Sequence, residues 1–266
     1  MTVSKQFAGQ WSLILGSSSG MGAGVSRALA QAGSSIAGVH FDRRQAMPAI
    51  AALVRDMEHD GATVKYFNAN AAAPETRAEV CAFLKTATGG KPIRVLLHSL
   101  AFGTLKPFIA ADPANAIAPK DMDMTLDVMA HSLVYWTQDL VRAGLIGKGS
   151  RIFGMTSEGD VKAWRSYGAV SAAKCAMESH LRQLAVELAP LGVTANAIRA
   201  GVTDTPALRK IPESAKMADA AKARNPFGRL TTPADIGSAV VSLASDGCHW
   251  LTGNVIGVDG AELITA

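Results

Sequence analysis

A tyrosine and a lysine seven residues apart are the side chains of this sequence whose types and spacing could do chemistry together. They are Tyr167 and Lys174. Because a helix turns by about 100° per residue, a separation of seven returns to within roughly 20° of the starting direction, so both would lie on one face of a helix that begins near Tyr167. An ammonium beside a phenol favours the phenolate, which lets a hydroxyl with a reference pKa of about 10 act as an acid or hydrogen-bond donor nearer neutral pH. The same spacing also occurs where a tyrosine is half-buried and a lysine solvated, so the rest of the chain has to decide.

The elements on either side of this pair would place it at the edge of a sheet. Residues 151–157 form an apolar run that predicts a strand, and Ser157 stands at its carboxyl end, where ligands bind in open α/β sheets. After Tyr167, apolar residues recur at three- and four-residue steps, which predicts a helix with one face in the core that ends near Pro190 and Gly192.

A glycine-rich turn lies near the start of the chain. Residues 11–15 predict a strand, residues 16–24 contain four glycines, and the helical periodicity that follows ends at Gly33. Glycines let a backbone pass close to a pyrophosphate, and the free N–H groups at a helix start bind its negative charge. The order of strand, turn and helix therefore favours a dinucleotide site over a plain tight turn.

The end of the next predicted strand, 34–39, bears on the choice of dinucleotide. His40 stands where NAD-binding proteins carry an acidic residue, and Arg43 and Arg44 follow within a turn. Guanidinium groups suit a 2′-phosphate, so the sequence favours NADPH. Two alternatives remain: the arginines could be the solvated start of a helix that runs to Asp60, and Asp42 could receive the ribose of NAD.

The remaining pattern predicts the fold. Strands at 63–67, 93–97, 193–199 and 254–258 alternate with helices at 77–88, 121–143 and 233–245. Such alternation indicates βαβ units. We therefore expect a single doubly wound Rossmann-type α/β domain over residues 1–266, with a seven-stranded parallel sheet and helices on both faces. Residues 206–226 are rich in Ala and Lys with few large apolar side chains, which predicts a mobile substrate lid.

Composition excludes several classes of function. The 266 residues are 48% hydrophobic and 18% charged with a net charge of +4, and the basic residues are scattered, so a nucleic-acid-binding surface is not expected. Three cysteines without a CxxC pattern and six dispersed histidines indicate neither a disulfide framework nor a metal site. The start of the chain lacks a signal peptide and no run reaches the length of a membrane span. A reducing cytoplasm is the expected setting, and the pI of about 9.0 is compatible with an acidic carrier partner.

From about Trp11 to Ile264 these motifs together resemble the short-chain dehydrogenase/reductase superfamily. Gly16, Gly20 and Gly22 match its cofactor glycines, Asn70-Ala71 its adenine-side position, and residues 201–205 its segment beside the nicotinamide carboxamide. The resemblance implies this set of cofactor-binding residues: Gly16, Ser18, Ser19, Gly20, Met21, His40, Arg43, Arg44, Asn70, Ala71, Ser99, Leu100, Ala101, Lys174, Gly201, Val202, Thr203 and Thr205.

Within the superfamily, the sequence resembles the enoyl-acyl-carrier-protein reductases. The usual tyrosine and lysine are four apart, whereas position 170 here is Val and the spacing is seven. The run 98–102, His-Ser-Leu-Ala-Phe, is similar to the enoyl reductase run at that strand, and Met129 stands where common members keep a catalytic asparagine. Ser157 occupies the place of a second tyrosine in many enoyl reductases. It resembles the NADPH-using branch and also the catalytic serine of ketone reductases.

The resemblance implies NADPH-dependent reduction of a trans-2-enoyl thioester on an acyl-carrier protein or coenzyme A. Tyr167, Lys174 and Ser157 would be catalytic: Tyr167 would hydrogen-bond the thioester carbonyl, and Lys174 would hold the ribose and keep Tyr167 acidic. A homotetramer is also implied. Two alternatives stay open, a carbonyl reductase that uses Ser157 and Tyr167 on a ketone, and a dinucleotide-binding regulator without catalysis.

Overall fold

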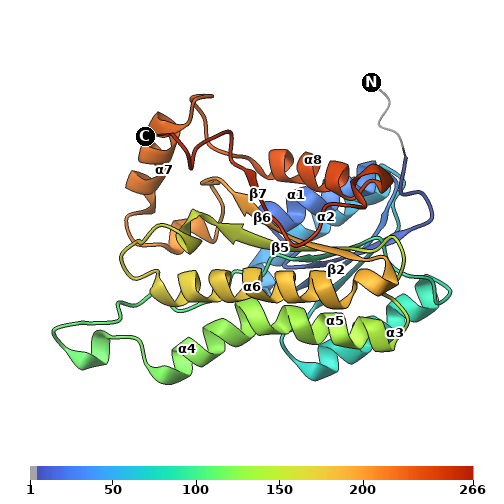
Figure 1. The fold of residues 1–266 in the computed structure, drawn as a ribbon, viewed down its shortest axis with the longest axis horizontal. Coiled ribbons are helices and arrows are strands. Elements are labelled where there is room, and N and C mark those ends of the chain that lie inside the picture. Colours follow the sequence, from blue (N-terminus) through green and yellow to red (C-terminus); the bar gives the residue numbers. More distant parts are fainter. Residues whose placement is uncertain (1–4, 266) are drawn as a thin grey trace.

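The computed structural model describes residues 5–265, and within them seven strands form one sheet in which every neighbouring pair is parallel (Figure 1). The strands are β1 (Trp11–Leu15), β2 (Ser35–His40), β3 (Val64–Asn68), β4 (Val95–His98), β5 (Arg151–Ser157), β6 (Thr194–Ala200) and β7 (Val255–Val258). Their order is β3-β2-β1-β4-β5-β6-β7. The predicted seven-stranded Rossmann-type sheet is confirmed.

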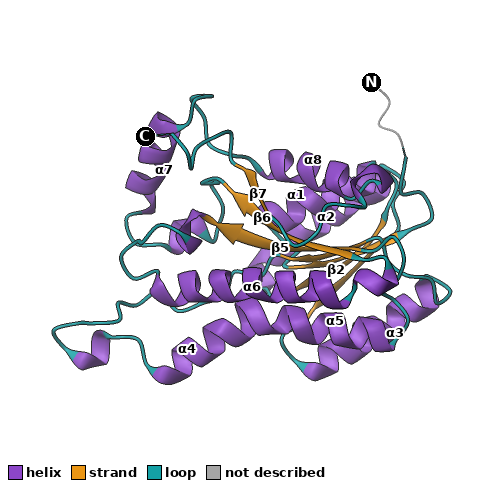
Figure 2. Cartoon of the chain, in the orientation of Figure 1, coloured by secondary structure: helices purple, strands orange, loops and turns teal. Residues whose placement is uncertain are grey.

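Helices cover both faces of the sheet (Figure 2). One face carries α1 (Gly20–Gln31), α2 (Met47–His59) and α8 (Pro233–Leu243), and the other carries α3 (Pro74–Ala87), α4 (Pro119–Leu126), α5 (Ser132–Arg142) and α6 (Gly168–Glu187). Each face has its own apolar cluster. All five residues of β1 are buried, as expected for a parallel strand that is covered on both sides.

Two predicted helices differ from the structure. The expected helix 121–143 begins at Pro119 and is interrupted by a π-helical turn, η3 (Asp127–His131), between α4 and α5. Hydrophobic periodicity could not reveal this turn, because a single turn with one extra residue leaves the segments before and after it helical. Such π-helical turns are frequent at functional sites. The helix expected from Arg77 begins at Pro74, since proline is well suited to a first helical position.

The predicted lid, 206–226, contains a short helix, α7 (Ser214–Arg224), in which Ala221 is the buried residue. Its proposed mobility stays a prediction. Within residues 5–265, no helix combines the length and the apolar character needed to cross a bilayer.

Strand register brings the carboxyl ends of the central strands to one edge. Leu15 pairs with His98, His98 with Gly154, and Ser157 with Ala200. The turns that follow β1, β4, β5 and β6 therefore lie next to one another along that edge. This is the place where open α/β sheets bind ligands.

Candidate active site

The turn between β1 and α1 is packed so tightly that its glycines cannot carry a side chain. Gly16 has φ +88° and Gly20 has φ +55°, the left-handed region that glycine adopts without penalty. A Cβ atom at Gly16 would overlap the carbonyl oxygen of Ser99, and one at Gly22 would overlap the carbonyl oxygen of Gly16. The turn thus presses against the chain that leaves β4.

The start of α1 fits a dinucleotide phosphate. Its N-cap, Ser19, makes no side-chain capping bond, and the first turn carries no acidic residue. The unpaired N–H groups and positive dipole end of the helix are therefore available to an anion. Ser18 and Met21 are partly exposed beside them. A Cβ atom at Gly20 would come within 3.1 Å of Thr205 Cγ2, so the glycine turn faces the 201–205 segment.

The end of β2 carries a buried imidazole beside two free arginines. His40 is buried, its Nδ1 lies 3.1 Å from Oδ2 of Asp42, and burial lowers the pKa of His40. The carboxylate of Asp42, which could otherwise receive a ribose, thus already has a partner. Arg43 and Arg44 are exposed and form no ion pair with any carboxylate among residues 5–265. They start η1 (Arg44–Ala46) ahead of α2, the helix expected to follow them.

The adenine-side residues and the residues after β4 also lie at this edge. Ala71 is buried and its carbonyl accepts a 2.7 Å bond from Trp136 Nε1, while Asn70 accepts from Ala72 N at 3.0 Å. Ser99 N donates to Leu15 O at 2.8 Å. Leu100 is partly exposed and Ala101 exposed.

The segment after β6 is held by its own side chains. Thr203 Oγ1 donates to Gly201 O at 2.9 Å, and Thr205 Oγ1 accepts from Leu208 N at 3.1 Å. Val202 N donates to Oε1 of Glu262 at 3.3 Å. A Cβ atom at Gly201 would overlap Thr231 Oγ1. This segment is therefore rigidly shaped although it has no strand partner beyond Ala200.

Tyr167 is the N-cap of α6, so the helix begins where the seven-residue spacing requires. Its hydroxyl lies 3.4 Å from Oγ of Ser157. The preceding residue, Ser166, has φ +62°, a conformation that costs free energy outside glycine and is found at functional sites. A Cβ atom at Gly159 would overlap the Tyr167 ring. The tyrosine ring is thus held between the turn after β5 and the first turn of α6.

Lys174 follows Tyr167 along α6, and its ammonium bonds to the main chain. Its buried Nζ donates to Met155 O at 2.7 Å. Burial lowers the pKa of Lys174 to about 8, against the opposing effect of Glu178 and Asp160. Burial raises the pKa of Tyr167, with Ser157 opposing and Asp160 adding to the rise. The Tyr167 hydroxyl thus contacts Ser157 and the Lys174 ammonium contacts Met155, and the acidifying effect of the lysine stays a prediction.

His98 and Met129 are buried behind this pair. His98 Nε2 lies 2.8 Å from Oγ of Ser132, whose hydroxyl donates to Val128 O at 2.8 Å. A hydroxyl has one hydrogen, so His98 Nε2 is the donor to Ser132. Burial, with the charge of Lys174, lowers the pKa of His98 to about 3, which keeps the imidazole neutral.

Sequence reasoning missed a buried ionic cluster beneath the turn that follows β5. Arg199 of β6 pairs with Asp160, its Nε at 2.8 Å from Oδ2, and lies 3.9 Å from Oε1 of Glu178. Thr156 Oγ1 donates to that same Glu178 oxygen at 2.7 Å. Burial raises the pKa of Glu178. No spacing signal could have found the cluster, because its members come from four separate elements.

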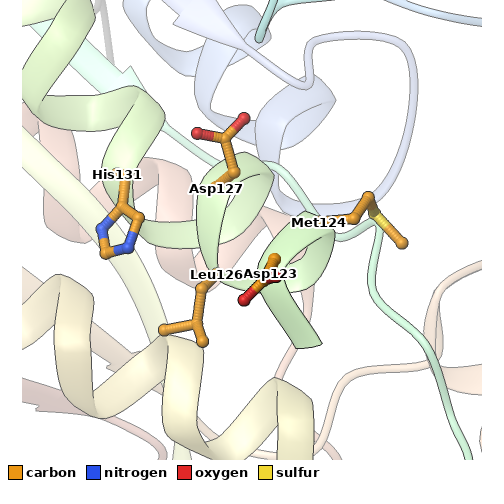
Figure 3. Close-up of a pocket in the computed structure, with 5 residues that line it drawn as sticks. All are labelled: Asp123, Met124, Leu126, Asp127 and His131. Atoms are coloured by element: carbon orange, nitrogen blue, oxygen red, sulfur yellow. The ribbon is translucent and has the colours of Figure 1, made fainter. Parts of the chain in front are cut away.

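A surface cavity of about 430 Å³ lies apart from these residues (Figure 3). Its lining side chains all come from α4 and η3: Asp123, Met124, Leu126, Asp127 and His131. None of the predicted site residues contributes to it. The edge formed by the turns after β1, β4, β5 and β6 is therefore the better candidate for the active site.

Comparisons with known proteins find relatives that match most of the chain. A family model described as enoyl-(acyl carrier protein) reductase matches residues 16–260. The cis-4-hydroxycyclohexanecarboxylate dehydrogenase of Sinomonas cyclohexanicum is 30% identical over 267 residues, 96% of each chain. The 1-cyclohexenylcarbonyl-CoA reductase of Streptomyces collinus is 30% identical over 176 residues, so the match covers 62% of this chain and 61% of that relative. The crystal structure of an enoyl-[acyl-carrier-protein] reductase (NADH) from Aquifex aeolicus superposes with a TM-score of 0.84 at 23% identity, covering 98% of this chain and 99% of that one.

Proposed function

This chain belongs to the enoyl-(acyl carrier protein) reductase family of the short-chain dehydrogenase/reductase oxidoreductases, and on that premise we propose that it reduces a trans-2-enoyl thioester to the saturated acyl thioester. The observation that carries the proposal is the position of Tyr167. It caps α6, seven residues before Lys174, with its hydroxyl directed to the turn that carries Ser157.

The position of the tyrosine favours conjugate reduction over ketone reduction. Moving it from four to seven residues before the lysine shifts it by about 4.5 Å along a helix axis. In a ketone the carbon that accepts hydride carries the oxygen, whereas in an enoyl thioester the carbonyl carbon lies two bonds beyond it. A hydroxyl displaced along the axis suits the second geometry.

The chain's own groups have these roles in the proposal. Tyr167 donates a hydrogen bond to the thioester carbonyl and stabilises the enolate that forms. Ser157 orients the Tyr167 hydroxyl, and Lys174 holds the ribose hydroxyls of the cofactor. When bound, the nicotinamide cofactor supplies the hydride that C3 of the substrate accepts.

Membership of the superfamily implies a nicotinamide cofactor, and we propose NADPH. Arg43 and Arg44 are exposed and unpaired within the described chain, while Asp42 is engaged by His40. The enoyl reductase of Aquifex aeolicus is described as using NADH, so the proposal of NADPH rests on the residues of this chain alone. The free guanidinium groups favour the 2′-phosphate here.

The wider setting follows from the same proposal. The substrate is carried on an acyl-carrier protein or coenzyme A, residues 1–266 act as one domain with 206–226 as the lid, and the enzyme works in the cytoplasm as a homotetramer.

The distance of 3.4 Å between Ser157 Oγ and the Tyr167 hydroxyl favours a second candidate function, a carbonyl reductase in which both hydroxyl groups bind a ketone oxygen.

An NADPH-oxidation assay with paired substrates separates the two candidates. We expect turnover of a crotonyl-type thioester at least about ten times faster than of the matching 3-oxoacyl thioester, a difference of about 1.4 kcal/mol in transition-state stabilisation. A protein that reduces the ketone and leaves the enoyl thioester untouched would be a carbonyl reductase. A protein that binds NADPH and reduces neither would fit the regulator.

A further inference from the structure

An arginine at the end of the lid helix joins three separate parts of the chain. Arg224 is the last residue of α7, which lies beside the C-terminal residues in Figure 1. Its Nη2 lies 3.0 Å from Oε2 of Glu158 and 3.3 Å from Oε1 of Glu262, and its Nε donates to the main-chain oxygen of Glu262 at 2.8 Å. Glu158 directly follows Ser157. One guanidinium therefore ties the lid to the catalytic turn and to the C-terminal residues.

Glu262 in turn supports the segment after β6. Its Oε1 accepts the N–H of Val202, and its Oε2 lies against Gly201, where a Cβ atom would come within 2.9 Å. The side chain is 0% exposed, and Oε2 has no hydrogen-bond partner among residues 5–265. Burying an ionised carboxylate oxygen without a donor costs more free energy than burying the neutral, protonated acid.

The surroundings of Glu262 favour that proton. Burial, followed by the neighbouring Glu158, raises the pKa of Glu262 to about 7, while the N–H of Val202 and the charge of Arg224 act in the opposite direction. Two further charged side chains lie near Glu158 and Glu262: Lys162, whose Nζ is 2.7 Å from Oε2 of Glu158, and Asp259, whose carboxylate accepts the N–H groups of Ala261 and Leu263 on either side of Glu262.

We propose that Glu262 is a positioning residue for the 201–205 segment and that Arg224, held by Glu262 and Glu158, fixes the C-terminal end of the lid to it. We call these three residues the lid latch. The inference rests on the proposed function, in which the 201–205 segment faces the cofactor.

The direction of the pH effect follows from linkage. In the latched arrangement the pKa of Glu262 is above the ordinary carboxyl value, so the contribution of Glu262 to the latch is fully present at pH values below about 4 and is lost as pH rises through about 7. When the end of the lid is released, water reaches the carboxyl groups of Glu262 and Glu158, and hydration favours their ionised forms. Rising pH therefore loosens residues 206–226.

The test compares wild type with Glu262→Gln, which keeps the shape of the side chain but cannot ionise. Hydrogen-exchange protection of residues 206–226 is measured without cofactor from about pH 6 to about pH 8.5 and corrected for intrinsic exchange. In wild type we expect protection to fall at least about fivefold across this range, and the dissociation constant of the tighter-binding dinucleotide, NADPH or NADH, to rise by a similar factor. Glu262→Gln should show neither change. Glu187→Gln, an exposed carboxylate at the end of α6, should behave as wild type.

Two variants of the arginine keep the test decisive should Glu262→Gln not fold. Arg224→Gln removes the charge that favours the ionised carboxylate, so the pH midpoint for loss of protection should move upward. Arg224→Lys keeps the charge but lacks the Nε that donates to the main-chain oxygen of Glu262, so exchange of the lid should increase at every pH. Protection that does not change with pH in wild type, or a dependence unaltered in Glu262→Gln and Arg224→Gln, would overturn the latch.

The two proposals fail in different ways. If the enzyme binds a dinucleotide and reduces enoyl thioesters while lid protection is flat with pH, the latch alone is wrong. If neither dinucleotide binds, both the proposed function and the latch are wrong.

Discussion

The turn after β1 and the turn after β5 lie at the same edge of the sheet, yet they are held in different ways. The first is built from backbone: Gly16 and Gly22 leave no room for a Cβ atom. The second is held by ion pairs between side chains, one between Arg199 and Asp160 and one between Arg224 and Glu158. A backbone cradle fixes shape whatever the pH, whereas a charged one depends on protonation. Binding of a cofactor requires a turn whose shape is fixed, whereas proton-dependent chemistry requires a turn that responds to protonation.

The largest effect should follow from removing one hydroxyl in the turn after β5. Tyr167→Phe should lower kcat for the enoyl thioester by about 100- to 1000-fold, because the enolate loses its hydrogen-bond donor. Dinucleotide binding and the unfolding midpoint should stay near wild type, since the glycine cradle is untouched. Tyr135→Phe, at an exposed tyrosine on α5, is the matched control and should keep full activity. We also expect near-complete loss of activity in Lys174→Ala. Weak cofactor binding in Tyr167→Phe would mean that the two regions are not separate.

An intermediate effect should follow from adding one methyl group to the cradle. Gly22→Ala places a Cβ atom on the carbonyl oxygen of Gly16 and should lower the free energy of unfolding by about 1–3 kcal/mol, because the backbone has to shift. The shift should also weaken dinucleotide binding by about ten-fold or more. Gly247→Ala is the control, since its nearest neighbour would be 3.9 Å away and its φ is not positive. Denaturant unfolding and a fluorescence titration measure both quantities. Equal behaviour of the two variants would contradict a backbone-built cradle.

The smallest effect tests the charged residues that follow β2, the strand beside β1. Changing Arg43 and Arg44 together to Ala should raise the KM for NADPH by about tenfold, because both guanidinium groups are exposed and partly screened by solvent. The KM for NADH should change much less, since NADH lacks the 2′-phosphate. Arg55→Ala, at an exposed arginine on α2, serves as the control. An equal rise for both cofactors would argue against the assignment of NADPH.

Most of the fold was predictable because its signals are local. The bounds of β1 and β5 agree with the predicted strands, and Tyr167 caps the helix that its spacing to Lys174 required. Apolar runs, glycine turns and helical periods act over a few residues, so each could be found without knowing the rest of the chain. The roles of the predicted site residues remain proposals, since a position at the sheet edge does not by itself establish a contact with cofactor or substrate.

What the sequence by itself determined is the set of elements and the residues that follow each strand. What only the tertiary structure decided is which charges meet. Glu262 and Arg224 are 38 residues apart, and Arg224 and Glu158 are 66 apart. Lys174 faces a main-chain carbonyl of β5, and the π-helical turn η3 interrupts a continuous helical pattern. Burial, and with it the shifted pKa values of Glu262 and Lys174, is a property of the packed chain, because desolvation depends on what several distant segments place around a side chain.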